Sequence, residues 1–199
     1  ELDDPTSYAL LRIGKCYEKL GKKALAIKYF NKTVHEDPLL DKGWIAITDF
    51  YVRQKNFQKA LFFVNKALNI DNQNRFYWKR FATINKEMNF FEEAEYGYKK
   101  AVEFGDTALD TWLFWVDILQ FLGEFDSAIQ TLLQATEFYP EEYEVEYRLA
   151  GLYFMLHDDK KGKFHISNGL RLNFKNHTIL EELFPVVWTR KMVQNAINK

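Results

Sequence analysis

The chain has 199 residues, of which 47% are hydrophobic and 17% aromatic, and its formal net charge is −1. This apolar content excludes a disordered protein, and the near-zero charge argues against a nucleic-acid-binding protein, which usually has a strong basic excess. No long uncharged apolar run is present, so we expect no insertion into a membrane. The single cysteine, Cys16, excludes an internal disulfide, and we expect it to be a small buried residue.

Taken in order, residues 1–6 are a polar lead-in and the rest of the chain is a series of amphipathic helix pairs. Turns within the pairs are expected at residues 21–22, 55–56, 89–90, 123–124 and 157–159. Turns between the pairs are expected near residues 37–38, 71–74, 105–106 and 139–141. Because no Pro-, Gly- or Ser-rich linker interrupts this series, we predict a single domain at residues 1–199.

Small residues recur every 34 residues in the second helix of each expected pair. This series is Ala26, Ala60, Ala94, Ala128 and Gly162, and two aromatic series run in parallel, Trp44, Trp78, Trp112 and Phe57, Phe91, Phe125. Two helices approach closely only where their contact residues are small, and one pair cannot bury its apolar face alone. The period therefore predicts stacked helix pairs.

This pattern resembles the tetratricopeptide repeat (TPR), a helix–turn–helix unit of the same length. The unit at residues 7–40 carries the large, small, aromatic and proline residues of the family pattern at Leu10, Ile13, Gly14, Tyr17, Ala26, Phe30 and Pro38. Further units follow at residues 41–74, 75–108, 109–142 and 143–176. Departures from the pattern occur at Thr48, Asn85, Val116, Gly162, Gly169 and Phe174. The resemblance implies an all-α fold, a right-handed α-solenoid of helix–turn–helix TPR units.

Residues 177–199 begin a sixth unit and then depart from it at Pro185, which should kink or restart the helix. Its apolar side is expected to hold Val186, Val187, Met192, Val193 and Ile197. We predict a capping segment, and a truncated further repeat is the alternative. The first unit has no polar cap before it, which predicts either missing upstream repeats or self-association through the N-terminal end.

The sequence contains no Gly-rich phosphate loop, no HExxH and no CxxC motif, and its four histidines form no evident ligand set. We therefore predict a protein that is not an enzyme and that has no metal site and no cofactor. A cytoplasmic location is expected, although a processed or excised chain would have lost any signal peptide.

The TPR resemblance implies that a ligand lies in the groove lined by the first helix of each unit. The predicted peptide-binding residues are Arg12, Lys15, Asp49, Arg53, Lys79, Arg80, Phe114, Asp117, Phe121, Tyr147 and Arg148. Basic residues dominate the first three units and apolar residues the last two, which predicts a peptide that is acidic at one end and apolar at the other. Alternatively, some of the apolar residues pack against neighbouring helices. The two-carboxylate clamp of some TPR proteins is not expected, because Leu11 and Ala46 stand where it needs polar residues.

The function predicted from these features is a non-catalytic scaffold that binds a protein or peptide segment. One alternative is an RNA-processing scaffold of the half-TPR type, suggested by the aromatic residues at 77–78 and 112–115. The other is a helper domain excised from a larger enzyme or sensor.

Overall fold

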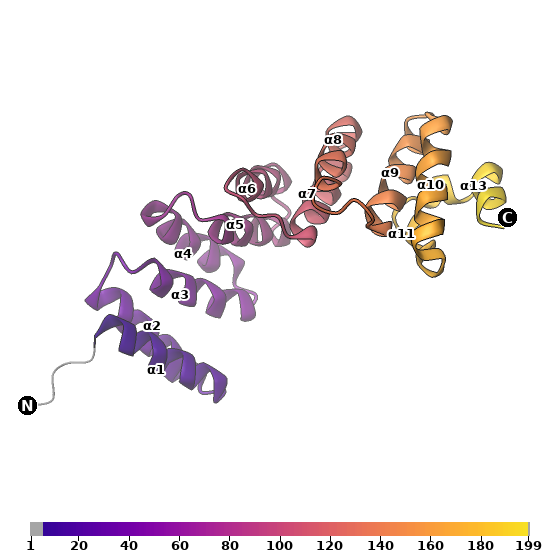
Figure 1. Cartoon of the computed structure of the whole chain (residues 1–199). Coiled ribbons are helices and arrows are strands. Elements are labelled where there is room, and N and C mark those ends of the chain that lie inside the picture. The colour runs from indigo at the N-terminus through magenta and orange to yellow at the C-terminus, as the bar shows by residue number, and fades with distance from the viewer. Residues whose placement is uncertain (1–5, 199) are drawn as a thin grey trace, which may run out of the picture. The chain divides into compact units, whose positions relative to one another are not determined.

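The computed structural model describes residues 6–198, which fold into helices, with no strand among them (Figure 1). Ten of the helices form five pairs joined by short turns. The pairs are α1 (Ser7–Lys19) with α2 (Lys23–Glu36), α3 (Asp41–Arg53) with α4 (Phe57–Ile70), α5 (Arg75–Glu87) with α6 (Phe91–Glu103), α7 (Leu109–Phe121) with α8 (Phe125–Ala135) and α9 (Tyr143–Met155) with α10 (Asp159–Asn173). The predicted all-α fold of helix pairs is confirmed. Across residues 6–198, no helix has both the length and the apolar character needed to cross a membrane.

The helices follow the 34-residue period without an insertion. The first helices begin at residues 7, 41, 75, 109 and 143, and the second helices begin at residues 23, 57, 91, 125 and 159. The first helices thus begin where the five TPR-like units of the sequence begin.

The turn inside each pair contains one residue with a left-handed backbone, at the same position of every repeat. These residues and their φ angles are Gly21 (71°), Lys55 (55°), Asn89 (61°), Gly123 (79°) and His157 (62°). The next residue donates its N–H to a carbonyl of the last helical turn, as Lys22 does to Tyr17 O and Asn56 does to Tyr51 O, both at 2.9 Å. This bond closes the first helix and reverses the chain toward the second.

The small residues of the 34-residue series lie where the paired helices touch. Ala26, Ala60, Ala94 and Ala128 are fully buried. At Gly162 an added Cβ would stand 2.6 Å from the ring of Phe154, which is too close for any side chain. The predicted close helix crossings are therefore present, and glycine is required where an aromatic ring takes the space of the Cβ.

The tryptophan series ties the first helices to the turns that precede them. Trp44 Nε1 donates to the carbonyl of Pro38 at 2.8 Å, and Trp78 Nε1 donates to the carbonyl of Asn72 at 2.7 Å. Trp112 differs from these two half-buried residues, because only 2% of its surface is exposed and its Nε1 has no hydrogen-bond partner among residues 6–198. Trp44 and Trp78 thus have a structural role at the repeat junctions.

The described residues divide into two compact units, the first ending at Asp106 and the second beginning at Thr107. The first unit contains α1–α6 and packs around buried side chains such as Phe30, Ile47 and Val64. The second unit contains the remaining helices around one continuous apolar core. The sequence predicted one domain at residues 1–199 with no boundary between residues 106 and 107. That single domain stays a prediction.

Three short helices and one 3-10 turn complete the second unit. They are η1 (Phe174–Asn176), α11 (Ile179–Leu183), α12 (Pro185–Trp188) and α13 (Lys191–Ile197). Pro185 begins α12. Proline suits this position, because an N–H in the first turn of a helix has no acceptor within the helix. Helices α11 and α12 pack on α9, and α13 packs on α10. Val187 is buried, but Val186, which was predicted on the same apolar side, is 65% exposed, because adjacent residues of a helical turn point in different directions.

Candidate functional site

The first helices of the first unit bring charged side chains of three repeats together. Lys15 and Glu18 come from α1, Asp49 and Arg53 from α3, and Arg80 from α5, and we call these five residues the charged cluster. Arg53 pairs with Glu18, and Arg80 Nε lies 2.9 Å from Asp49 Oδ1. The structure therefore gathers four of the predicted site residues, Lys15, Asp49, Arg53 and Arg80, on one face.

Asp49 is the centre of the charged cluster. Burial raises the pKa of its carboxyl group, and the nearby charges of Arg80, Arg53 and Lys15 oppose that rise without cancelling it. Asp49 Oδ1 is shielded from solvent and accepts no hydrogen bond, since the close Arg80 nitrogen contributes an ion pair but no aligned N–H.

The two arginines of the cluster remain accessible. The side chain of Arg53 is 50% exposed and that of Arg80 is 42% exposed. Exposed ion pairs of this kind contribute little to stability, about 0–1 kcal/mol, so an incoming carboxylate can compete for the guanidinium groups at low cost. Of the other predicted cations, Arg12 is exposed on α1 and Lys79 is half-buried on α5.

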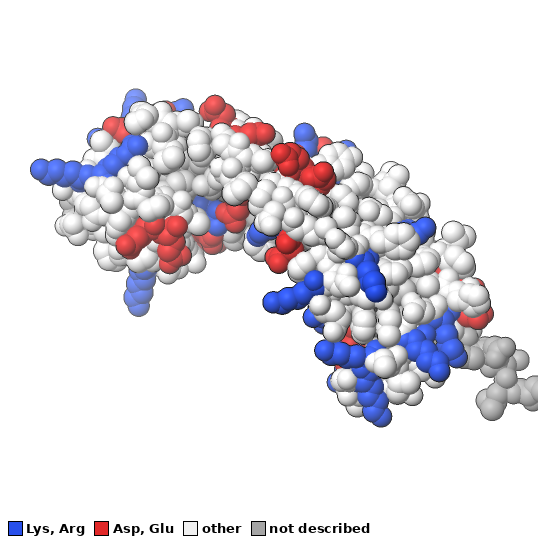
Figure 2. All heavy atoms as spheres, turned by 180° about the vertical axis from the view of Figure 1, so that it is seen from behind, with Lys and Arg blue, Asp and Glu red and all other residues white. Residues whose placement is uncertain are grey.

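Charge is divided unevenly between the two units. Residues 6–106 contain 18 Lys and Arg against 12 Asp and Glu, whereas residues 107–198 contain 8 against 13. Within the first unit, residues 6–86 contain 16 against 6. Figure 2 shows Lys and Arg side chains gathered over the helices nearest the N-terminus. The net charge of −1 conceals a basic first unit and an acidic second unit.

In the second unit, Arg148 joins two helices instead of facing a ligand. Its Nη1 lies 2.5 Å from Asp117 Oδ1 on α7, and its Nη2 and Nε lie 3.0 Å and 3.1 Å from Glu144 Oε1 on α9. Only 7% of the Arg148 side chain is exposed. Removing one partner of such a buried pair is strongly destabilising. The structure thus corrects the prediction that Arg148 is available to a peptide, whereas the side chain of Asp117 is 34% exposed and its part in peptide binding stays a prediction.

Tyr147 belongs to the core of the second unit. Its side chain is fully buried, its ring packs on Gly169, and its hydroxyl donates to the carbonyl of Asn173 at 2.8 Å. Burial raises the pKa of this hydroxyl to about 12. A surface ligand cannot reach the ring, so the prediction that Tyr147 binds a peptide is wrong. The alternative that some apolar groove positions pack against other helices holds for this residue.

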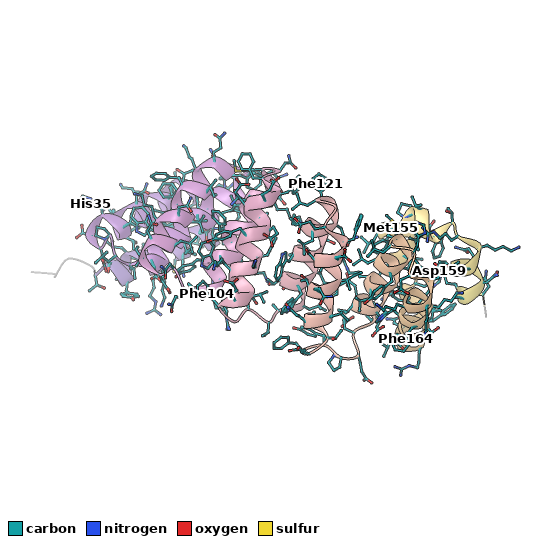
Figure 3. All side chains as sticks on the ribbon, turned by 90° about the horizontal axis from the view of Figure 1, so that it is seen from above. His35, Phe104, Phe121, Met155, Asp159 and Phe164 are labelled. Carbon is teal, nitrogen blue, oxygen red and sulfur yellow. The ribbon has the colours of Figure 1, made fainter. Side chains whose placement is uncertain are left out.

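The two predicted phenylalanines differ in exposure. Phe114 is half-buried on α7, whereas Phe121, the last residue of α7, is 68% exposed. Phe121 lines an open cleft of about 280 Å³ that lies within the second unit, and we call it the α7–α12 cleft. Its lining residues are Gln120, Phe121, Phe125, Met155, Leu183, Phe184, Pro185 and Val186. Figure 3 shows Phe121 and Met155 on one side of this unit and Phe164 on the other.

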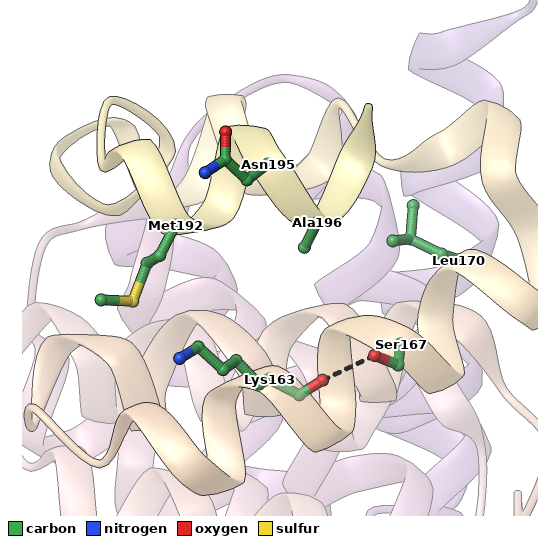
Figure 4. Close-up of a pocket in the computed structure, with 6 residues that line it drawn as sticks. All are labelled: Lys163, Ser167, Leu170, Met192, Asn195 and Ala196. Carbon is green, nitrogen blue, oxygen red and sulfur yellow. Dashed lines mark hydrogen bonds between the residues drawn. The ribbon is translucent and has the colours of Figure 1, made fainter. Parts of the chain in front are cut away.

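A second cleft of the same unit lies between α10 and α13 and has a volume of about 550 Å³ (Figure 4). It mixes polar and apolar side chains, among them Lys163, Asn195 and Met192. Ser167 donates its hydroxyl hydrogen to the carbonyl of Lys163 at 2.8 Å, so that group is already satisfied. Nothing in this lining selects one kind of ligand.

The sequence did not reveal two features of these surfaces. Leu183, Phe184, Pro185 and Val186 complete the α7–α12 cleft, and the only signal for their position was the helix restart at Pro185. Cys16 was expected to be buried and is exposed on α1. It lies two residues after Gly14, which faces Phe30, so that the turn of the helix carries the thiol away from α2.

Comparison with known proteins identifies the repeats. Residues 8–39 and residues 109–142 each match a tetratricopeptide-repeat family. Similar solved structures include the MamA protein, at 15% identity over 85% of this chain and 92% of that chain, with a TM-score of 0.74. YrrB, described as a TPR protein with an unusual peptide-binding site, matches at 14% identity over 90% of this chain and 92% of that chain, with a TM-score of 0.75.

A third similar structure is the first TPR of Spaghetti (RPAP3) bound to the HSP90 peptide SRMEEVD, at 23% identity over 61% of this chain and 96% of that chain, with a TM-score of 0.57. At these identities the likeness establishes the fold. Together with the two matched repeats and the 34-residue register of the helices, it shows that the chain is a tetratricopeptide-repeat protein.

Proposed function

We propose that this chain is a non-catalytic scaffold that binds an acidic segment of a partner protein on the first helices of its first unit. The observation that carries the proposal is the charged cluster, in which Arg53 and Arg80 are held in place by carboxylates and remain half exposed. A carboxylate of the partner would replace water on these guanidinium groups, which match carboxylates in a fork geometry.

The excess of positive charge on the first unit would speed the encounter with such a segment. Electrostatic attraction of this kind acts mainly on the association rate and falls with salt, since the screening length is about 8 Å at physiological ionic strength. The two neighbours whose descriptions mention a peptide or a peptide-binding site support a peptide as ligand.

An RNA-binding scaffold is less well supported. Two of the aromatic residues that suggested it, Trp112 and Tyr77, are buried and cannot stack on bases, and the hydroxyl of Tyr77 donates to Asp41 Oδ2 at 2.6 Å. Within the charged cluster, Glu18 and Asp49 alternate with the cations, and their carboxylates would repel a continuous phosphate chain.

The test is selection of peptides from a phage-displayed library of random dodecapeptides against the immobilised full chain. We expect enrichment of peptides rich in Asp and Glu. Fluorescence anisotropy at several salt concentrations should show that Arg53→Glu and Arg80→Glu each weaken the binding of these peptides on the order of tenfold.

Lys66→Glu is the matched control, because it makes the same charge change at an exposed position of α4, outside the charged cluster. Circular dichroism confirms that each variant is folded. The proposal is contradicted if the parent chain and the three variants bind the acidic peptides equally. It is also contradicted if a single-stranded RNA oligonucleotide displaces these peptides at a lower concentration than an acidic peptide does.

A further inference from the structure

The α7–α12 cleft presents an apolar surface that the core of the second unit does not use. Phe121 is 68% exposed and Val186 is 65% exposed, although both are large apolar residues and both line the cleft. The side chains of Phe125, Met155 and Leu183 contribute further apolar surface. The volume of about 280 Å³ is below the range of about 300–1,000 Å³ typical of small-molecule sites, so the cleft suits one or two side chains of a peptide.

One polar group in the lining lacks a partner. Gln120 Oε1 is shielded from solvent and accepts no hydrogen bond from any residue in the range 6–198. Because the protein covers this oxygen, a ligand does not reach it, and the apolar side chains alone carry the fit.

The charged residues that flank the lining in the sequence are mostly acidic, and we call them the acidic rim. Within two residues of a lining residue the sequence has four exposed carboxylates, Glu124, Asp126, Glu181 and Glu182, and no Lys or Arg. His157 also lies within two residues of Met155, and Arg190 donates to the carbonyl of Phe154 at 2.5 Å, which engages its guanidinium group. Such a rim favours a segment that carries Lys or Arg beside its apolar residue.

We propose that the α7–α12 cleft is a second docking site, which takes a peptide segment with one large apolar side chain flanked by Lys or Arg. This inference rests on the proposed scaffold function, and it concerns a different unit and the opposite ligand charge. The apolar side chain enters between Phe121 and Val186, and the basic side chains lie over the acidic rim.

The same random dodecapeptide library tests this proposal on the full chain. We expect a second class of enriched peptides, in which a Leu, Met or aromatic residue is flanked by Lys or Arg. By fluorescence anisotropy, Phe121→Ala and Val186→Ala should each weaken the binding of this class on the order of tenfold. Neither substitution should change the binding of acidic peptides.

Phe164→Ala is the matched control, since Phe164 is 61% exposed on α10 and lies on the other side of the same unit. The proposal is overturned if the apolar–basic peptides bind Phe121→Ala and Val186→Ala as they bind the parent, or if only acidic peptides are enriched. In the second case the charged cluster stands as a binding site. If no peptide of either class is enriched, both proposals fail. Sedimentation velocity supplies a further check, because dissociation of an oligomer by Phe121→Ala would assign the cleft to a second copy of the chain.

Discussion

The ring of Phe184 lies directly on the backbone of Gly151, where a Cβ on residue 151 would stand 2.3 Å from the nearest ring atom. Gly151 belongs to the middle of α9, and Phe184 precedes α12. The contact lets the C-terminal segment close on α9, and it seats Phe184 in the wall of the α7–α12 cleft.

Gly151→Ala should therefore destabilise the second unit by about 1–3 kcal/mol, because the new methyl group overpacks this contact and outweighs the usual gain of alanine in a helix. Urea denaturation measures the change. In the double variant Gly151→Ala/Phe184→Leu the cost of the alanine should shrink, since the smaller side chain leaves room for it. An equal cost of the alanine with and without Phe184 would contradict the contact.

The five turn residues with a left-handed backbone predict that introducing glycine raises the stability of the fold and that replacing glycine lowers it. Lys55→Gly and His157→Gly should stabilise the fold by about 0.5–1 kcal/mol, because a non-glycine residue is strained at this φ. Gly21→Ala and Gly123→Ala should destabilise it by about 1 kcal/mol, and a Cβ at either position meets no atom within 4 Å, so backbone strain alone acts. Thermal unfolding of the four variants checks the sign of each change. A loss of stability in Lys55→Gly and His157→Gly would show that these turns are unstrained.

Asp49 predicts a pH-dependent stability of the first unit. Its folded-state pKa is raised above 3.8, so the stability that it contributes is fully present below pH 3.8 and is lost as the pH rises through the folded pKa. Asp49→Asn should remove this loss and should be more stable than the parent at pH 7 but not at pH 3.5. It should also bind acidic peptides more tightly, because Arg80 and Arg53 are then less neutralised. Urea titrations at the two pH values, and anisotropy at pH 7, measure these differences.

Tyr147 predicts a loss of stability at high pH. Its pKa is raised from 10.0 to about 12, so its contribution is complete below pH 10 and is lost as the pH rises through 12. Tyr147→Phe should cost about 1 kcal/mol at pH 7, through the lost hydrogen bond to Asn173. The difference between parent and variant should narrow between pH 10 and pH 12, and a constant difference over that range would contradict the assignment. Chemical denaturation at each pH gives the comparison.

The sequence predicted the helix pairs well, because a 34-residue spacing of small residues reports the helix crossings themselves. Ala26 and Ala94 are buried at such crossings, and the turns at residues 21 and 123 lie where glycine marked them. These signals are local, and each unit repeats them.

The candidate site was predicted less well, because equivalent repeat positions do not have equivalent neighbours. Lys15 and Asp49 occupy the same repeat position, and both face the charged cluster. Arg148 occupies the repeat position of Phe114, which is half-buried, but it is buried itself, because Asp117 of α7 and Glu144 of α9 hold its guanidinium group. Tyr147 is buried because its ring packs on Gly169 of α10 and its hydroxyl donates to the carbonyl of Asn173. These contacts depend on which side chains stand opposite, and the repeat spacing does not encode that.

The unbroken 34-residue register also determines which changes of chain length the fold can accept. One residue inserted into α3 would rotate all later side chains of that helix by about 100° and would carry Thr48 away from its buried position. Removal of 34 residues that make up one complete unit would instead leave every later helix in phase with the repeat, although the side chains opposite it would change. Recombination that adds or removes whole repeats in the gene would therefore keep the helix pairs and their close crossings, and it would alter the set of docking surfaces.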